Sequence, residues 1–591
     1  MPTNTADIFR ILTVAPNLIQ IEVLDADRFK QDSSDFTIGS YLKISDDSNT
    51  SIIALVQSFK IKETTTGGTA DIARPSFILD AQPIGFLDED GKFKRGGQQI
   101  AIPPNNVSIA DDAILKGIYE SVGEDKKFCF ANLAQKPSIE IAVDGDKFFS
   151  KHIAVVGSTG SGKSGTVARI LQEGIRPSAD QTQRGVLNNT HILLFDLHGE
   201  YKTAFPKSKK LDVSSLVLPY WLMNSEELEE MFIESNENNS HNQVSQFRFA
   251  VIQNKKKHNP SVVNPSYDSP LYFSLKEVHT FITNLNNEVV GKVDGENARP
   301  KLSDGTLVDD RCTYYFDEKR TFVVQSTAAA TKASNGPFNG EFDRFVMRLE
   351  SKINDNRLSF LLKPKKSATE EFKTSDFPVI LKQFIGYNET EKEKENITII
   401  DLSGIPFEVL SIVVSLISRL VFDFCFYYKA VKAASTEVPF LLVLEEAHNY
   451  IPQSEGAKYY SVKKSIERIA KEGRKYGLSL MIVSQRPSEI SETIFSQCNN
   501  FVAMRLTNPT DQQYVKRLMP DSVSAITDTL PVLERQEALI IGDSIPIPTI
   551  VRIKDLTDKP DSNDIHFRTE WKKDWVDITF TELINKIKKE E

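Results

Sequence analysis

The sequence is poor in cysteine, in export signals and in uncharged apolar runs. Its 591 residues include four cysteines, which lie far apart without a Cys-x-x-Cys pair, so neither a disulfide framework nor a zinc site is predicted. The first residues lack a basic segment followed by an apolar one and a cleavage site, which favours a cytoplasmic protein. The most apolar stretch, 409–428, contains Arg419 and Asp423. We therefore predict a buried helix there and no membrane span.

The sequence also lacks an excess of basic residues. Its 71 Lys plus Arg stand against 81 Asp plus Glu, for a formal net charge of -10. This balance argues against a protein that coats nucleic acid with its whole surface, although a basic channel lining is compatible with it. The hydrophobic share of 40% and the charged share of 26% are typical of globular proteins. The length predicts about three to five structural units.

The first expected unit, residues 1–135, is rich in short alternating runs separated by Gly, Pro, Asp and Asn, which predicts an N-terminal β-barrel. The clearest runs are 18–23, 41–44, 51–56, 76–79 and 99–102. The pattern then changes to that of an α/β core. In 136–223, an apolar strand at 153–156 precedes a glycine-rich turn, a helix and a second apolar strand at 192–195. This order is typical of βαβ units in a parallel sheet.

Residues 224–378 are predicted to form a mainly helical insertion that divides the α/β core. The second part of the core is expected over 379–558. Its predicted strands are 397–400, 440–444, 478–484, 500–505 and 538–541. The tail, 559–591, ends in an expected amphipathic helix and is a candidate brace between subunits.

The strongest local signal is the segment GSTGSGKS over residues 157–164, which matches G-x-x-x-x-G-K-[ST]. Its glycines allow backbone N–H groups to approach phosphates, and the following helix adds its positive end. Lys163 is predicted to reach the β and γ phosphates, and Ser164 to ligate Mg²⁺. The expected cofactors are therefore ATP and Mg²⁺. The loop residues predicted to bind nucleotide are Thr159, Gly160, Ser161, Gly162, Lys163 and Ser164.

Hydrolysis also requires acids near the metal and the attacking water. Glu445 and Glu446 follow the apolar strand 440–444, at the sheet edge where ligands of α/β proteins bind. We assign Glu445 to the Mg²⁺ shell through water, and Glu446 to orienting the attacking water. Acids at a strand end are also commonly just solvated. Asp196, which closes the strand 192–195, is an alternative metal-shell acid, and the sequence leaves this division of roles open.

Gln485 follows the predicted strand 478–484 and either contacts the γ phosphate or attacking water, or only caps the strand. Two arginines, Arg468 and Arg474, lie on or just after a predicted charged helix. A charge run is usually a solvated face. Ring ATPases, however, draw an arginine from a neighbouring subunit to stabilise transition-state charge. Arg474 is the candidate we favour.

Several long motifs, taken together, resemble the HerA family of the HerA/FtsK branch of P-loop ATPases. They run in family order from about residue 152 to 511 and include VVGSTGSGKS, FDLHGEY, LEEAHNYIP, EGRKYGLSLMIVSQRPSEI and RLTNPTDQ. The resemblance implies a RecA-like core and an N-terminal barrel similar to that of rotary ATP synthase subunits. It further implies a homohexameric ring that hydrolyses ATP and moves double-stranded DNA through its pore.

The resemblance also carries roles onto individual residues. It implies that Glu446 is the catalytic acid, Gln485 the sensor, and Arg474 the arginine of the EGRK block. Lys151 stands where the family has an arginine that reaches a neighbour's ATP, and the two side chains are not equivalent. The segment 547–551, which contains Thr549 and Ile550, resembles one that closes over nucleotide. Family members often have Asp where this chain has Glu445.

Relatives of this length occur beside a nuclease or a NAD-cleaving, sirtuin-like effector in antiphage systems, or beside a DNA end-resection nuclease, so we expect such a partner. A motor for secretion or conjugation is a rival, but such proteins usually carry membrane helices. A second rival is a nucleotide-gated ring scaffold that assembles and regulates an effector with little translocation. Basic residues expected in pore loops are Lys352, Arg357, those of 363–366, Lys458, Lys463 and Lys464.

Overall fold

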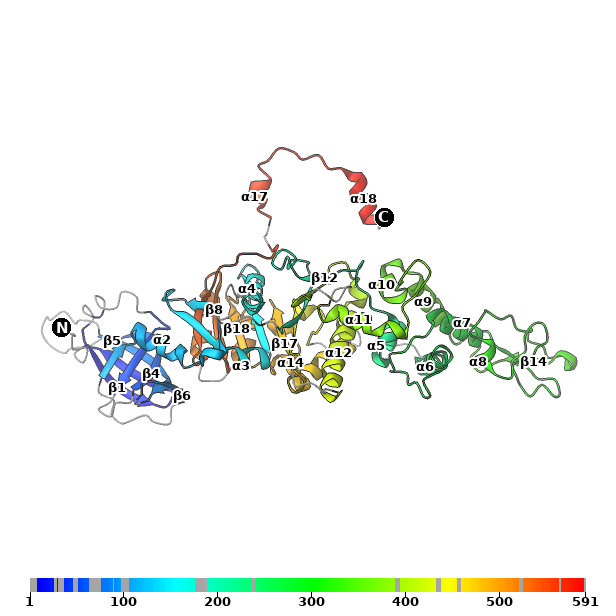
Figure 1. The fold of residues 1–591 in the computed structure, drawn as a ribbon, viewed down its shortest axis with the longest axis horizontal. Coiled ribbons are helices and arrows are strands. Elements are labelled where there is room, and N and C mark those ends of the chain that lie inside the picture. The colour runs from blue at the N-terminus through cyan, green and yellow to red at the C-terminus, as the bar shows by residue number, and fades with distance from the viewer. Residues whose placement is uncertain are drawn as a thin grey trace.

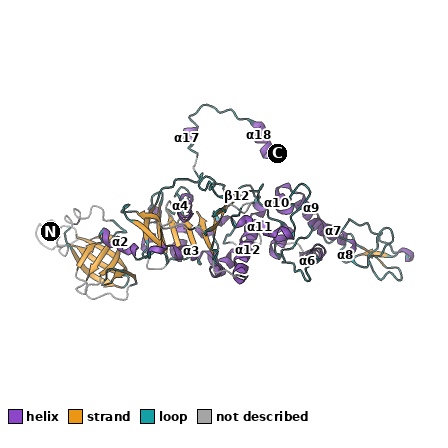
Figure 2. Ribbon diagram, viewed as in Figure 1, coloured by secondary structure: helices purple, strands orange, loops and turns teal. Residues whose placement is uncertain are grey.

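The chain forms an elongated molecule in which two sheet regions and a helical region follow one another. The structure is a computed structural model and describes residues 8–25, 29, 37–45, 51–62, 76–88, 90–96, 106–175, 187, 189–234, 240–387, 394–431, 437–453, 459–519, 524–562 and 565–588. Figure 1 shows the N-terminal sheet at one end, the large sheet in the middle and a helical region at the other end. Strands gather in the first two regions and helices in the third (Figure 2).

The N-terminal unit is a seven-stranded antiparallel sheet in the order β1-β2-β5-β4-β3-β7, with β6 paired to β5. Its strands are β1 (Phe9–Ala15), β2 (Leu18–Val23), β3 (Tyr41–Ser45), β4 (Ser51–Lys62), β5 (Ser76–Leu87), β6 (Phe93–Arg95) and β7 (Asn106–Ile109). A separate hydrophobic core, which includes Ile19, Ile21 and Leu79, lies against it.

The predicted β-barrel is corrected to a half-barrel sheet. Closure requires the two end strands to pair, and in the described residues no hydrogen-bonded ladder joins β1 to β7. The two longest strands, β4 and β5, pair along their whole length with two register shifts, which bend the sheet without closing it. The strand predicted at 99–102 lies outside the described residues.

The large sheet has 11 strands in the order β12-β15-β11-β16-β17-β10-β18-β19-β20-β8-β9. They are β8 (Lys127–Leu133), β9 (Glu140–Asp144), β10 (Ile153–Val156), β11 (His191–Asp196), β12 (Lys209–Leu211), β15 (Ile397–Asp401), β16 (Phe440–Leu444), β17 (Leu478–Ser484), β18 (Asn500–Met504), β19 (Glu537–Gly542) and β20 (Thr549–Ile553). Every predicted strand of the α/β core is present in it.

The large sheet is parallel from β12 to β18 and antiparallel from β18 to β9. The central parallel strands are buried, largely apolar runs, as expected when both faces are covered: β10 reads IAVV and β17 reads LSLMIVS, all buried. Short connections join β8 to β9 and β19 to β20. The first contains the expected boundary at residue 135, so β8, which was expected in the N-terminal unit, belongs to the large sheet.

The long helix α12 (Phe407–Val431) confirms the buried helix predicted at 409–428. It is the one helix in the described part of the chain that is long and apolar enough to span a membrane, judged by length and composition. Of its most apolar 18-residue stretch, 78% is buried inside the protein. The Arg419 guanidinium donates to Glu227 Oε2 at 2.7 Å and to the Leu222 carbonyl at 2.7 Å. These contacts fix the charge inside the protein core.

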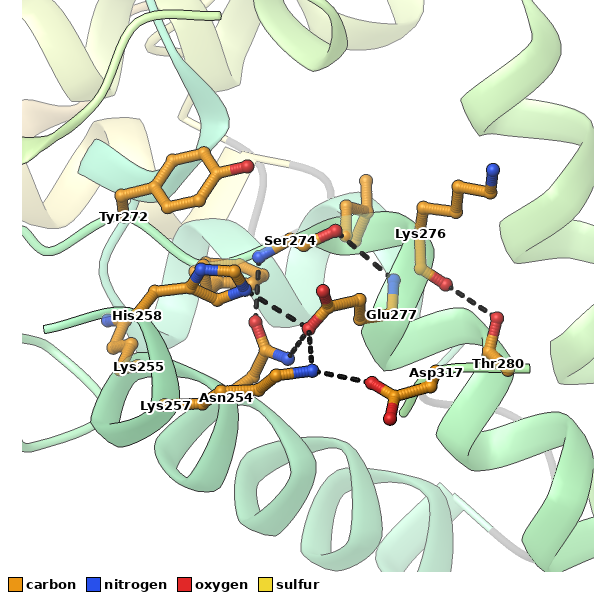
Figure 3. A network of polar contacts seen from close by, with 12 residues as sticks. Asn254, Lys255, Lys257, His258, Tyr272, Ser274, Lys276, Glu277, Thr280 and Asp317 are labelled. Atoms are coloured by element: carbon orange, nitrogen blue, oxygen red, sulfur yellow. Dashed lines mark hydrogen bonds and ion pairs between the residues drawn. The ribbon is translucent and has the colours of Figure 1, made fainter. Parts of the chain in front are cut away.

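Between β12 and β15 the chain leaves the sheet and forms a largely helical region. Its elements are α5 (Ser225–Phe232), α6 (Ser240–His258), α7 (Leu275–Asn286), β13 (Val289–Gly291), α8 (Arg311–Tyr314), β14 (Ala333–Asn335), α9 (Asp343–Asn354), α10 (Ser359–Leu362) and α11 (Phe377–Phe384). A polar network centred on Glu277 joins α6 to α7 (Figure 3). Helix α7 ends at Asn286, shortly before β13 begins at Val289.

The C-terminal tail stands away from the rest of the molecule (Figure 1). It contains α17 (Phe567–Glu570) and α18 (Phe580–Lys588), in agreement with the amphipathic helix predicted at the end of the chain. Large apolar side chains are exposed along it, among them Trp571, Trp575 and Phe580. Its root is fixed, since Asp561 N–H donates to the Glu200 carbonyl at 2.8 Å.

Candidate nucleotide-binding site

The loop that matches the phosphate-binding pattern lies at the carboxyl edge of the large sheet, between β10 and α4 (Lys163–Ile175). Gly160 and Gly162 have φ of 76° and 98°, a region that favours glycine. The loop is held from both neighbouring strands: Gly157 N–H donates to the Ser484 carbonyl at 3.3 Å, and Ser158 N–H to the Arg505 carbonyl at 2.8 Å. The helix therefore begins at Lys163, with its positive end next to the loop.

Lys163 and Glu446 lie in direct contact. Lys163 Nζ is 2.7 Å from Glu446 Oε1, and each side chain is only 8% exposed. Glu446 follows β16 in the left-handed region, with φ 46° and ψ 46°. A non-glycine residue there stores about 1–3 kcal/mol of strain, and such strain is concentrated at functional sites. The turn thus directs a carboxylate toward the one lysine of the loop.

Glu445 is buried beside its neighbour, at 1% exposed. Its Oε2 accepts the Leu197 N–H at 3.3 Å, so it contacts the β11–β12 connection. Burial, with the nearby Asp196 and Glu200 carboxylates, raises the pKa of Glu445 well above its ordinary value. An additional cation or proton would therefore be favourable at this position.

Asp196 ends β11 and is fully buried. Its Oδ1 accepts the Gly199 and Glu200 N–H groups at 2.8 and 3.1 Å, and its Oδ2 accepts the Tyr201 N–H at 3.0 Å. The carboxylate thus organises its own loop. Burial nevertheless raises its pKa. Among the described residues, no hydrogen bond joins Asp196 to Ser164.

The acid in contact with Ser164 is Glu200, which sequence reasoning did not identify. Ser164 Oγ–H donates to Glu200 Oε2 at 3.2 Å. Burial raises the pKa of Glu200, which is partly exposed. Its position four residues after the end of β11, in the loop FDLHGEY, was an available signal, because that loop follows a strand of the same sheet edge.

Gln485 follows β17 and contacts the loop directly: Thr159 Oγ1–H donates to Gln485 Oε1 at 2.6 Å. His448, a second residue not identified from the sequence, lies 3.3 Å from Glu446 Oε2 through Nδ1 and 3.1 Å from Ser484 Oγ. Burial lowers the pKa of His448, so the ring is neutral at neutral pH. The loop, Glu446 and the end of β17 therefore form one connected site.

The arginine candidates lie on or after α13 (Tyr460–Glu472). Arg468 stacks over Phe422 with its guanidinium carbon 4.3 Å from the ring centroid, and it pairs with Glu472 at 3.7 Å. Arg474 is exposed in the turn that follows the helix. Of the two, Arg474 is the side chain less engaged within its own chain among the described residues.

Three predicted site residues lie away from the loop of their own chain. Lys151 precedes β10, at the opposite end of that strand, and its Nζ pairs with Asp543 at 2.6 Å. Thr549 is buried in β20, where its Oγ1 lies 2.9 Å from Tyr119 Oη. Ile550 pairs with Leu539 in the neighbouring strand. None of the three is brought to Lys163 within one chain.

Several predicted DNA-contacting residues are paired with acids. Arg357 Nη2 lies 2.6 Å from Asp355, Lys366 Nζ lies 2.8 Å from Asp376, and Lys464 pairs with Glu226. Lys352 and Lys463 are partly exposed, and Lys365 is exposed. Lys458 lies outside the described residues. The basic side chains of these three pairs are 43%, 52% and 57% exposed, so they are accessible to a stronger anion.

The donor set fits Mg²⁺ carried with nucleotide. Two buried polar atoms at the site, Tyr201 Oη and Glu446 Oε2, have no hydrogen-bond partner within the described residues. Glu445 lies near the Asp196, Glu200 and Glu446 carboxylates as well as Lys163, and a cation would reduce this excess of negative charge. No cluster of three or more His, Cys, Asp or Glu suited to metal binding occurs in the described part of the chain.

The parallel sheet, the glycine-rich loop and the lysine that begins α4 define the class of P-loop nucleotide-binding α/β proteins. The model of the family described as helicase HerA, central domain, matches residues 128–421. The DNA double-strand break repair helicase HerA of Saccharolobus solfataricus is 25% identical over 78% of this chain and 75% of its own length. That of Pyrococcus furiosus is 26% identical over 76% and 74%.

A probable helicase of Methanocaldococcus jannaschii is 25% identical over 83% of this chain and 78% of its own length. Among solved structures, VirB4 of Thermoanaerobacter pseudethanolicus is 12% identical, with a TM-score of 0.43, over 74% of this chain and 98% of its own. The plasmid coupling protein TrwB with ADPNP is 13% identical, with a TM-score of 0.43, over 76% and 94%. The chain belongs to the HerA family, and by that membership it is an ATPase.

Proposed function

We propose that this chain is a RecA-like, ATP-hydrolysing motor that acts as a homohexameric ring and translocates on or unwinds double-stranded DNA. The observation that carries the proposal is the 2.7 Å contact between Lys163 Nζ and Glu446 Oε1, next to a loop of phosphate-binding geometry. Relatives with similar length are named as DNA double-strand break repair helicases, which supports DNA as the substrate.

The chemistry follows from the placement of the chain's own groups. Lys163 and the loop N–H groups bind the phosphates, and Ser164 provides a hydroxyl ligand for Mg²⁺. Bound Mg²⁺ would neutralise charge on the phosphate oxygens. Glu446 orients and deprotonates the attacking water, while Gln485 fixes Thr159 at the tip of the loop.

A ring would supply three predicted contacts that are not made within one chain. Lys151, Thr549 and Arg474 lie away from the phosphate loop of their own chain, and we assign them to the nucleotide of a neighbouring subunit. The tail, with exposed Trp571 and Trp575, is assigned as a brace against that neighbour. A ring also confines basic residues to a pore while its exterior remains acidic.

ATP hydrolysis with and without duplex DNA tests the proposal. We expect duplex DNA to stimulate hydrolysis by the wild-type protein and to bind at low salt. Absence of both would contradict translocation. A partner nuclease or NAD-cleaving effector, which we also propose, as in antiphage systems, would be sought by co-purification. If the effector stays active with Glu446→Gln, the chain acts instead as a nucleotide-gated scaffold.

A further inference from the structure

We infer that Glu200 is the positioning residue for the Ser164 hydroxyl, so that it, rather than Asp196, sets the affinity of the site for Mg²⁺ with nucleotide. The inference rests on the proposed ATPase function. It assigns a role to Glu200, which neither the sequence motifs nor position at the end of a strand had identified. Its starting point is one contact, in which Ser164 Oγ–H donates to Glu200 Oε2 at 3.2 Å.

A serine hydroxyl that ligates a cation must use an oxygen lone pair for the metal and direct its proton elsewhere. A carboxylate that accepts this proton fixes the hydroxyl rotamer and increases the electron density on the oxygen. Glu200 accepts it in this structure. Outer-shell carboxylates of this kind orient metal ligands in other sites.

The competing acids are engaged elsewhere. Asp196 accepts three backbone N–H groups, from Gly199, Glu200 and Tyr201, and is fully buried. Glu445 accepts the Leu197 N–H at 3.3 Å. Asp196 therefore shapes the loop that presents Glu200, and its own oxygens are occupied by that loop.

The backbone of Glu200 is held from both sides, which gives its side chain a defined position. Its N–H donates to Asp196 Oδ1 at 3.1 Å, and its carbonyl accepts the Asp561 N–H at 2.8 Å. Further along the same two segments, Thr203 Oγ1–H donates to the Lys559 carbonyl at 2.7 Å. The root of the C-terminal tail thus braces the loop against α4.

A second observation points independently to a ligand beside Glu200. The Tyr201 hydroxyl is fully buried and has no hydrogen-bond partner among the described residues. A buried hydroxyl without a partner is unfavourable unless water or a ligand completes its hydrogen bonding. Hydration water of a bound cation is the class of ligand that would satisfy it.

The test measures Mg²⁺ dependence of nucleotide binding, without hydrolysis. A fluorescent, non-hydrolysable ATP analogue is titrated into the full-length protein in EDTA and at rising Mg²⁺. For Glu200→Ala we expect a half-saturating Mg²⁺ concentration about tenfold higher, the lower end of the range for outer-shell residues. Glu200→Gln, which keeps an oxygen that can accept the serine proton, is expected to show a smaller shift.

The matched control is Glu140→Gln, which should leave the Mg²⁺ dependence unchanged. Glu140 lies on the β8–β9 hairpin and pairs with Lys554. Binding in EDTA should be equal in all four proteins, which also shows that each is folded. If Glu200→Ala has the wild-type Mg²⁺ dependence, the inference is wrong and the ATPase proposal stands. If the wild-type protein binds no analogue at all, the proposed function itself fails.

Discussion

The nucleotide site and the Glu277 network of the helical region are both built from charged side chains, but they handle charge in opposite ways. In the helical region, Glu277 Oε2 accepts from Asn254 at 2.6 Å and lies 3.1 Å from His258 and 3.3 Å from Lys257 (Figure 3). Burial alone would raise the pKa of Glu277, but the hydrogen bonds from Asn254 and His258 outweigh it, so the pKa is lowered.

At the nucleotide site the balance is reversed. Burial raises the pKa of Glu445, Asp196 and Glu200, and two buried polar atoms lack partners in the described residues. A network that satisfies its charges stabilises a fold, whereas one that leaves them unbalanced is prepared for a ligand. The difference separates a structural network from a functional one.

The sharpest test of this difference is Glu446→Gln. Removing the charge should lower ATP hydrolysis about 10²- to 10⁴-fold, the range for a general base. Binding of nucleotide should persist, and thermal stability should change little, because glutamine keeps the side-chain length and an oxygen that can accept from Lys163 Nζ. Steady-state hydrolysis and thermal unfolding measure the two effects. A variant with clearly lower thermal stability but wild-type ATP hydrolysis would contradict this assignment of Glu446.

The complementary change is Glu277→Ala in the helical region. It leaves Asn254 and Lys257 without their shared acceptor, so we expect a loss of about 2 kcal/mol in the free energy of unfolding. Urea unfolding measures it. Asp317→Ala is the control, since Asp317 is 62% exposed and contacts only the outer end of the network, and it should cost under about 0.5 kcal/mol. Equal losses of unfolding free energy in the two variants would show that Glu277 is not the centre of the network.

Lys255, on α6 of the helical region, should make the stability of the protein depend on pH. It is fully buried, with Nζ donating to the Tyr267 and Ser269 carbonyls at 2.6 Å, and burial lowers its pKa to about 7. Because the folded pKa lies below the unfolded one, the folded state binds fewer protons above pH 7, and stability rises with pH there.

Relative to Lys255→Met, the wild-type protein should therefore gain up to about 1.4 kcal/mol per pH unit between pH 7 and 9. Urea unfolding of both proteins at pH 7, 8 and 9 measures this gain. A wild-type curve parallel to that of the variant would mean that Lys255 keeps its proton throughout.

The smallest expected effect is that of Gln485→Ala. The contact between Thr159 Oγ1 and Gln485 Oε1 is a neutral hydrogen bond at the partly open tip of the loop. Its loss should lower the turnover number about fivefold, the rate equivalent of about 1 kcal/mol. Single-turnover hydrolysis resolves this step. If turnover is unchanged, Gln485 is only a strand cap, the alternative that the sequence left open.

The local parts of this account could be predicted from the sequence. Strands β10, β16 and β17 are continuous apolar runs, and the loop before α4 has a fixed spacing of glycines and lysine. Both features depend only on residues that are close together in the sequence. Pairing between distant segments could not be predicted. The half-barrel and the antiparallel part of the large sheet depend on which strands meet, which periodicity does not specify.

The acids at the site show the same limit at the level of single residues. Strand-end position predicts that Asp196 and Glu446 reach the carboxyl edge, and both do. It does not predict that three N–H groups of the next turn occupy Asp196 and leave Glu200 to contact Ser164. The roles of Lys151, Thr549 and Arg474 across a subunit interface stay predictions, since one chain cannot supply both sides.

The central claim is that the loop around Lys163 binds ATP. Its most direct test is the affinity of a fluorescent ATP analogue for the wild-type protein and for Lys163→Ala, with Lys475→Ala as an exposed lysine control. We predict that the wild-type protein and the control bind equally, while Lys163→Ala loses about 100-fold in affinity, equivalent to about 2.8 kcal/mol. Equal binding by all three folded proteins would contradict the account.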